Sequence, residues 1–246
     1  LEYGDIEAGG IRCAYHGWLF DVSGQCLEMP AEPNNSKFPR KIKHLSYFVR
    51  EQGGLIFAYM GPDQDDPPPL PKYSPLVDRG GQRQIEHVRH CAYNWFNFFE
   101  NSADPAHICI LHRHAGYGDQ TWGDQFFSYK EMPEFNFIEM HYGMKVVMTK
   151  PGPTPGSEWV DEMSLAMPSI IQVGDTEFVH AKVDAAALMR EGSQCEHLLF
   201  LTPNDDDHFM IFTVDYYTGS DRNFFEKLRQ MRDREVPKQP VKEYDR

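Results

Sequence analysis

Residues 11–21 read IRCAYHGWLFD, and the interpretation of the N-terminal part of the chain depends on this stretch. Cys13 and His16 are three positions apart, so a short loop can direct a thiolate and an imidazole toward one iron or zinc ion. Gly17 follows, and a residue without a side chain lets the backbone come close to a bound group. A Cys-x-x-His pair alone is a modest signal, because a buried cysteine beside a histidine at a strand end has the same spacing.

The sequence around this loop is typical of short strands separated by turns. Residues 21–24 have the composition of a turn, and residues 29–39 form a loop rich in Pro, Asn and Glu. Residues 44–50 and 54–59 have the β-branched and aromatic content of strands. These features predict a small antiparallel β domain over residues 1–61.

A proline-rich acidic segment comes next. Residues 61–71 read GPDQDDPPPLP, a composition that neither a helix nor a central strand can accommodate. Such a segment is extended and semi-rigid. We therefore predict a linker at residues 62–78 and a second domain at residues 79–246.

The second domain is predicted to contain helices and antiparallel strands. It begins with a strand (85–93) and a helix (94–114), strands dominate from Ile138 onward, and residues 223–235 return to a helical pattern. Two sets of alternating apolar residues have the period of half-buried strands. The sets are Met144, Val146 and Met148, and Met210, Phe212, Val214 and Tyr216.

A second candidate metal site lies in residues 100–112, which read ENSADPAHICILH. His107, His112 and a nearby carboxylate are the ligand types of a 2-His-1-carboxylate iron site, which leaves coordination positions open for dioxygen. Asp104 and Pro105 are typical of a helix N-cap and the first helical residue. Asp104 and His107 are then three apart and share a face of the helix.

His107 and His112 do not meet easily on a regular helix. At a separation of five residues, the two side chains point roughly 140° apart around the helix axis. Binding of one metal ion by both therefore needs a distortion such as a π-type bulge. His114 is seven residues from His107 and lies nearly on the same face without any bulge. Because the chain has 11 histidines, two of them can also lie this close together by chance, without binding a metal.

Together the two motifs resemble a known family. Residues 11–21 are similar to the second ligand loop of Rieske proteins, and Asp-x-x-His-x4-His at residues 104–112 is similar to the mononuclear-iron motif of Rieske non-haem iron oxygenase catalytic (alpha) subunits. The resemblance extends to Asn94-Trp95 and Glu100-Asn101 and, more weakly, to residues 202–208. It is strongest for the phthalate-dioxygenase-like branch.

The resemblance implies an α+β fold, in which a partial Rieske domain precedes a larger antiparallel sheet with helices of the helix-grip (Bet v 1/START-like) type. Cys13 and His16 would hold one half of a Rieske [2Fe-2S] cluster. A Cys-x-His pair holds the other half in the family, and it would precede Leu1. The family's carboxylate iron ligand lies on a late helix, which we expect beyond Arg246. We therefore expect a chain truncated at both ends.

The resemblance also implies roles at the second site. His107 and His112 would bind the mononuclear Fe(II), and Asp104 would accept hydrogen bonds from His107 and from His16 of a neighbouring subunit, fixing both rings. Three consecutive aspartates are fallback candidates for the third iron ligand, although they follow a Thr-Pro where a turn or cavity rim is expected: Asp205, Asp206 and Asp207.

The function implied is that of an oxygenase component. A reductase or ferredoxin would supply electrons through the cluster, and dioxygen would be used to hydroxylate, dihydroxylate or demethylate an aromatic or similar small organic substrate. Two other classes remain open. One is a non-catalytic Rieske-type electron carrier, in which the second domain has no iron. The other is a zinc hydrolase that uses Cys13, His16, His107 and His112.

Composition limits the partners. The formal net charge of −13 disfavours a nucleic-acid surface, because a polyanion would be repelled over most of the molecule. Five scattered cysteines fit a reducing compartment better than a disulfide framework. No apolar run has the length of a membrane span. We expect a cytoplasmic homotrimer or higher homo-oligomer, the oligomer being implied by the resemblance, with no membrane partner.

Overall fold

The computed structural model describes residues 1–85, 89–111, 132–151, 155, 158–174 and 195–226. The chain divides into two compact units, Leu1–Lys72 and Tyr73–Arg246. Among the residues described, no helix combines the length and apolar character that a bilayer crossing requires.

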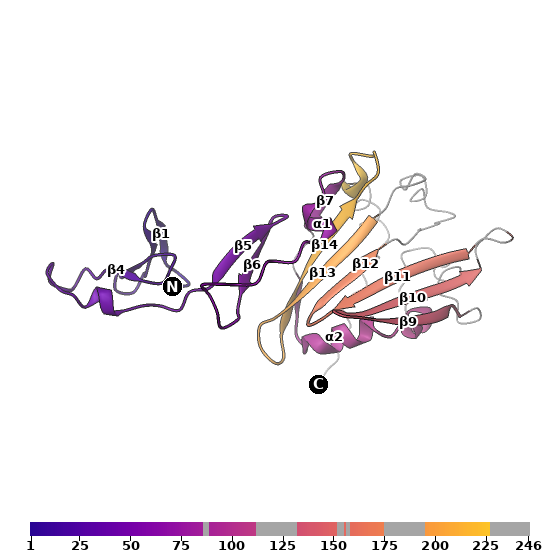
Figure 1. The fold of residues 1–246 in the computed structure, drawn as a ribbon, viewed down its shortest axis with the longest axis horizontal. Coiled ribbons are helices and arrows are strands. Elements are labelled where there is room, and N and C mark those ends of the chain that lie inside the picture. Colours follow the sequence, from indigo (N-terminus) through magenta and orange to yellow (C-terminus); the bar gives the residue numbers. More distant parts are fainter. Residues whose placement is uncertain (86–88, 112–131, 152–154, 156–157, 175–194, 227–246) are drawn as a thin grey trace, which may run out of the picture. The chain divides into compact units, whose positions relative to one another are not determined.

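The first unit is built from short antiparallel strands (Figure 1). A four-stranded sheet has the order β1-β2-β3-β4, and a separate hairpin pairs β5 with β6. Buried Phe20, Cys26 and Met29 pack together as its core, with Trp18 and Ile42 against them. The elements are β1 (Asp5–Glu7), β2 (Gly10–Arg12), β3 (Leu19–Phe20), β4 (Cys26–Glu28), the 3₁₀ turn η1 (Pro39–Lys41), β5 (Phe48–Gln52) and β6 (Leu55–Tyr59).

The predicted turn at residues 21–24 is confirmed, and it joins β3 to β4. Asp21 Oδ1 accepts hydrogen bonds from the amides of Ser23 and Gln25, both at 2.9 Å. Gly24 has φ +82° and lies where a Cβ atom would be 2.1 Å from the His44 carbonyl oxygen. The strand predicted at residues 44–50 begins only at Phe48, because His44 is still bonded to the turn of the small sheet, its amide donating to the Gly24 carbonyl.

The second unit is an antiparallel sheet with helices, as predicted for an α+β fold. The sheet has the order β7-β14-β13-β12-β11-β10-β9, and β8 pairs with the other half of β14. Its elements are α1 (Ser74–Val77), β7 (Gln82–Ile85), β8 (Arg89–Cys91), α2 (Trp95–Ser102), α3 (Ala106–Leu111), β9 (Glu134–Met140), β10 (Gly143–Pro151), β11 (Glu158–Ala166), β12 (Ile170–Gly174), β13 (Cys195–Pro203) and β14 (Phe209–Tyr217).

The core lies between α2 and one face of this sheet, which we call the inner face. Buried Phe99 of α2 packs against inner-face residues of five strands: Val146, Leu165, Ile171, Leu201, Phe209 and Ile211. The opposite, outer face contacts α1 through β13 and β14, and Tyr73 meets Phe200 edge-on there. Figure 1 shows α2 near the end of the sheet where β13 turns into β14. The Asn94 side chain donates to the Asp206 carbonyl at 2.7 Å and fixes that end.

The alternating patterns hold with one correction. Val146 and Met148 are each 2% exposed, as a buried stripe on β10 requires. In β14 the predicted stripe lies on the outer face, whereas Phe209 and Ile211 contact the inner-face core. From Thr213 to Tyr217 every residue is buried, so the prediction of a half-buried strand is wrong for this half. The reason is that the sheet is covered on both sides there.

The prediction of one helix over residues 94–114 is also wrong. Two helices replace it, separated at Ala103, Asp104 and Pro105, because proline has no N–H to continue the hydrogen-bond ladder. Residues 112–114 lie outside the described part of the chain. The strand predicted at 85–93 becomes β7 and β8, which both pair with β14. Of the predicted helical segment 223–235, residues 223–226 are described, and the last three of them are helical.

Candidate metal sites

Cys13 and His16 lie on one tight turn between β2 and β3. The Cys13 amide donates to the Trp18 carbonyl at 2.8 Å, and the Gly17 amide donates back to the Cys13 carbonyl at 2.9 Å. Gly17 has φ +73°, a conformation that favours glycine. The turn therefore presents residues 13 and 16 from the same short loop, as their spacing predicted.

The environment of Cys13 favours a metal-binding thiolate. Hydrogen bonds from the backbone amides of Tyr15 and His16 lower the pKa of the Cys13 thiol, with the Tyr15 bond contributing most. Cys26, one strand further on, is buried in the small core, and burial raises the pKa of its thiol. The thiolate is the form that binds metal. The His16 side chain is exposed and lies 3.9 Å from the Tyr15 ring, centroid to centroid.

Arg12 ties this turn to two neighbouring strands. Its guanidinium donates to both carboxylate oxygens of Glu7, at 2.6 and 2.9 Å, and to Glu28 at 2.8 Å. Its Nη1 donates to the Gly17 carbonyl at 2.7 Å, directly after His16. A planar guanidinium with several fixed donors suits such a clamp better than a lysine would.

His107, at the start of α3, is held in a defined orientation. Its Nδ1 donates to the Asp104 backbone carbonyl, which can only accept, so the proton is on Nδ1. Nε2 then carries the lone pair and accepts from the Asn101 side-chain amide at 3.2 Å. This tautomer, fixed by a carbonyl on the opposite nitrogen, is typical of a metal-binding histidine that coordinates through Nε2.

Asp104 has a local role in the structure. Its exposed carboxylate accepts from the Ala106 amide at 3.0 Å, as a residue that caps the first turn of α3 would do. Its contact with His107 is made by the backbone carbonyl. The bridging role in a neighbouring subunit therefore stays a prediction.

The remaining predicted ligands are only partly visible. His112 and His114 lie outside the described residues. Within the described ranges, no group of three or more His, Cys, Asp or Glu side chains is arranged to hold a metal ion. At the tip of the β13–β14 hairpin, Asp205 accepts from the Asp207 amide at 2.8 Å and faces His208 Nδ1 at 2.9 Å. The Asp207 amide is the main cause that lowers the pKa of Asp205, which fits the turn that the sequence suggested.

Two further polar contacts were not predicted. Asn101 contacts His107, six residues along the chain, across the break between the helices. His197 on β13 pairs with Asp215 on β14. Asp215 could have been noticed, because it is the one charged residue in the strand sequence FMIFTVDYY.

Comparison with known proteins matches both parts of the chain. Residues 1–45 match the Rieske [2Fe-2S] domain family. Phenoxybenzoate dioxygenase subunit alpha from Ectopseudomonas oleovorans is 42% identical over 125 residues, covering 46% of this chain and 30% of that protein. The 3-chlorobenzoate-3,4-dioxygenase oxygenase subunit from Comamonas testosteroni is 25% identical over 224 residues, covering 89% of this chain and 47% of that protein. Residues 1–45 carry a Rieske [2Fe-2S] domain, and the chain is similar to the alpha subunits of Rieske non-haem iron oxygenases.

The structures of Rieske oxygenases share this fold. Dicamba monooxygenase bound to dicamba matches with a TM-score of 0.68 at 20% identity, covering 93% of this chain and 65% of that one. A Rieske domain implies a [2Fe-2S] cluster, and the oxygenase relatives imply a mononuclear iron. The loop that carries Cys13 and His16 fits the first group, and the His107 tautomer fits the second. The chain spans less than half the length of the two curated relatives named here.

Proposed function

We propose that this chain is the electron-accepting and substrate-oxidising part of an oxygenase component that acts on a small aromatic molecule with dioxygen. The observation that carries this proposal is the combination of two features in one chain. The turn with Cys13 and His16 lies in the first unit, within the residues that match the Rieske domain, and His107 on α3 of the second unit has its proton on Nδ1, which leaves Nε2 able to bind a metal. A non-catalytic electron carrier would need only the first. The relative that covers 89% of the chain is an oxygenase subunit, which supports the oxygenase.

The chain's own residues supply positioning. In the first unit, Cys13 and His16 would bind one half of the [2Fe-2S] cluster. Arg12 ties their turn to β1 and β4 by hydrogen bonds to Glu7, Glu28 and the Gly17 carbonyl. His107, together with His112, would hold the mononuclear iron, and Asp104 would connect His107 to His16 of a neighbouring subunit. The cluster supplies one-electron transfer, and the mononuclear iron supplies dioxygen activation. Apolar inner-face residues around Phe99 would exclude water from the oxidation site.

The wider biological setting is part of the same proposal. The relatives named above include a phenoxybenzoate dioxygenase subunit and a 3-chlorobenzoate-3,4-dioxygenase subunit. These names support an aromatic substrate for this chain. A reductase or ferredoxin would donate electrons. A cytoplasmic homotrimer or higher homo-oligomer would let Asp104 meet His16 of another subunit. Hydroxylation, dihydroxylation and demethylation are all compatible with this arrangement of sites.

The test uses the intact protein purified with its iron. We expect a brown protein with a Rieske-type electron paramagnetic resonance signal, and oxygen uptake that depends on a reductase and is stimulated by an aromatic substrate. Metal analysis should give iron and not zinc. A protein that shows the cluster signal but no substrate-stimulated oxygen uptake would be an electron carrier. A zinc protein without the signal would be a hydrolase candidate.

A further inference from the structure

The side chain of Gln64 ties the proline-rich segment to the open end of the β5–β6 hairpin. Phe48 and Tyr59, the first residue of β5 and the last of β6, face each other there. The Phe48 amide donates to Gln64 Oε1 at 2.6 Å, and Gln64 Nε2 donates to the Tyr59 carbonyl at 3.0 Å. The same nitrogen donates to the Gly61 carbonyl at 2.6 Å. Gln64 therefore uses its acceptor oxygen and its donor nitrogen together at this anchor.

A second glutamine holds the other end of the segment, at the turn of the hairpin. Gln52 is the last residue of β5, and its Nε2 donates to the Pro71 carbonyl at 3.2 Å. Gln52 Oε1 is buried and has no hydrogen-bond partner within the residues that the structure describes. A buried acceptor without a partner is unfavourable, and this free energy is regained when water reaches it. The Gln52 anchor is therefore the weaker of the two.

Residues 64–71 thus connect the open end of the hairpin with its turn. The length permits this, because seven extended residues span about 22 Å and the four steps from Phe48 to Gln52 span about 14 Å. The segment includes three consecutive prolines at residues 67–69. Since proline fixes φ in the unbound segment as well, little conformational entropy is lost when the segment lies along the hairpin.

The chain is anchored again two residues later, in the second unit. The Tyr73 ring meets Phe200 edge-on, with the centroids 5.5 Å apart. The Tyr73 carbonyl accepts from two amides of α1, at 2.9 and 3.1 Å. The boundary between the two units falls between Lys72 and Tyr73. Exposed Lys72 is therefore the one residue between the anchored Pro71 and the anchored Tyr73.

We propose that residues 64–71 are a strap fastened along the β5–β6 hairpin, and that Lys72 is the hinge between the two units. With both anchors made, the connection between the units is free at Lys72. When the Gln52 anchor opens and the strap lifts, the free connection becomes residues 65–72. A longer free connection lets its ends move further apart, so the strap limits the movement of one unit relative to the other. This device does not depend on the proposed function.

The test is limited trypsin digestion of the intact, iron-loaded protein. Lys72 is the only Lys or Arg in residues 61–72, so a fragment that begins at Tyr73, detected by mass spectrometry, reports cleavage at the hinge. The cleavage rate follows the population in which the strap is released. We expect Gln64→Ala to be cleaved there about tenfold faster or more, because it loses the bonds of the stronger anchor. Gln52→Ala should be cleaved faster by a smaller factor.

The matched control is Asp66→Ala, since Asp66 is an exposed residue of the same segment whose side chain takes part in neither anchor. Hydrogen exchange of the Phe48 amide should rise in Gln64→Ala and stay unchanged in the control. Cluster absorbance shows whether each variant keeps a folded first unit, and Gln52→Ala decides if Gln64→Ala does not. Wild-type cleavage rates in both glutamine variants, or the same acceleration in Asp66→Ala, would overturn the proposal.

Discussion

At the scale of single residues, local spacing was the reliable guide. Cys13 and His16 share a tight turn, and the His107 ring is oriented by hydrogen bonds at both of its nitrogens. Both follow from neighbours within six positions. The pairing of His197 with Asp215 was missed, because the two residues are 18 positions apart and meet only through strand register.

The Asp104→Asn variant separates electron transfer from iron binding. Asn caps a helix about as well as Asp, so the Ala106 contact and α3 should persist. The variant removes the charge that would accept from His107 and from His16 of a neighbouring subunit. We expect the cluster signal and most of the mononuclear iron to remain while turnover falls by roughly tenfold or more. Iron content, cluster reduction and product formation should be measured on the same sample.

Full turnover in Asp104→Asn would mean that Asp104 only caps the helix. In that case the electron path would not run through this carboxylate. His114 would then be the alternative to His112 as the second iron ligand beside His107. Asp78→Asn is a suitable control, because Asp78 is an exposed aspartate that follows α1.

Arg12 offers a second test, on the stability of the cluster. Arg12→Gln removes the bidentate contact with Glu7 and the donor to the Gly17 carbonyl, so the ligand turn should move more freely. We expect the cluster to form but to be lost faster in the presence of a chelator, followed by visible absorbance. Arg50→Gln is the control, since Arg50 lies over the Phe48 ring away from the ligand turn. Equal loss rates in both variants would show that the clamp is not needed.

At the scale of elements, the sequence predicted types better than boundaries. Apolar alternation identified β10 and β14, but it does not show that α1 covers the outer face of β13 and β14. Pro105 marked a helix start, yet the apolar pattern on both sides favoured one continuous helix. The break is explained by Pro105, which has no N–H to donate, and by the Asp104 carboxylate, which caps the first turn of α3.

The turn between β3 and β4 depends on one glycine. Gly24 has φ +82°, and a methyl group there would meet the His44 carbonyl. We expect Gly24→Ala to lower the free energy of unfolding of the first unit by on the order of 2–4 kcal/mol. The check is a denaturant titration followed by the cluster absorbance. Gly9→Ala is the matched control, because its Cβ would meet only ordinary contacts at 3.6 and 3.7 Å.

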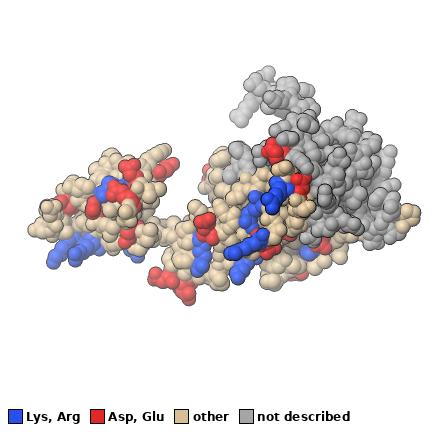
Figure 2. All heavy atoms as spheres, turned by 90° about the horizontal axis from the view of Figure 1, so that it is seen from above, with Lys and Arg blue, Asp and Glu red and all other residues tan. Residues whose placement is uncertain are grey.

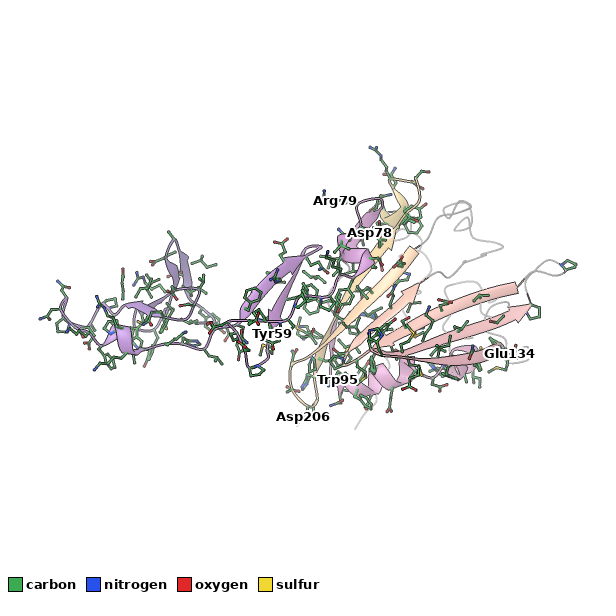
Figure 3. The ribbon with its side chains drawn as sticks, in the orientation of Figure 1. Tyr59, Asp78, Arg79, Trp95, Glu134 and Asp206 are labelled. Carbon is green, nitrogen blue, oxygen red and sulfur yellow. The ribbon has the colours of Figure 1, made fainter. Side chains whose placement is uncertain are left out.

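At the scale of the whole molecule, the interpretation as an oxygenase depended on the order of the two metal-binding motifs and the proline-rich linker along the chain. The division between Lys72 and Tyr73 lies within residues 62–78, where a linker was predicted from proline content. The assignment of a function to each domain stays a prediction. The net charge disfavoured only a nucleic-acid partner. On the face of the described residues that Figure 2 shows, acidic and basic side chains are interspersed. Figure 3 labels Trp95 of α2 and Asp206 of the β13–β14 hairpin, and the Asn94 side chain, next to Trp95, donates to the Asp206 carbonyl at 2.7 Å. Composition does not encode this contact between distant segments.

The last prediction follows from this division. Cys13 belongs to the first unit and His107 to the second, so each metal centre should be removable without loss of the other. We expect Cys13→Ser to abolish the Rieske-type signal and keep the mononuclear iron, and His107→Ala to keep the signal and lose that iron. Both variants should lose turnover, because electron delivery and dioxygen chemistry need both centres. Paramagnetic resonance and iron analysis on each protein provide the measurement. If either variant lost both centres while its melting temperature stayed at the wild-type value, the two sites could not be the independent ligand sets described here.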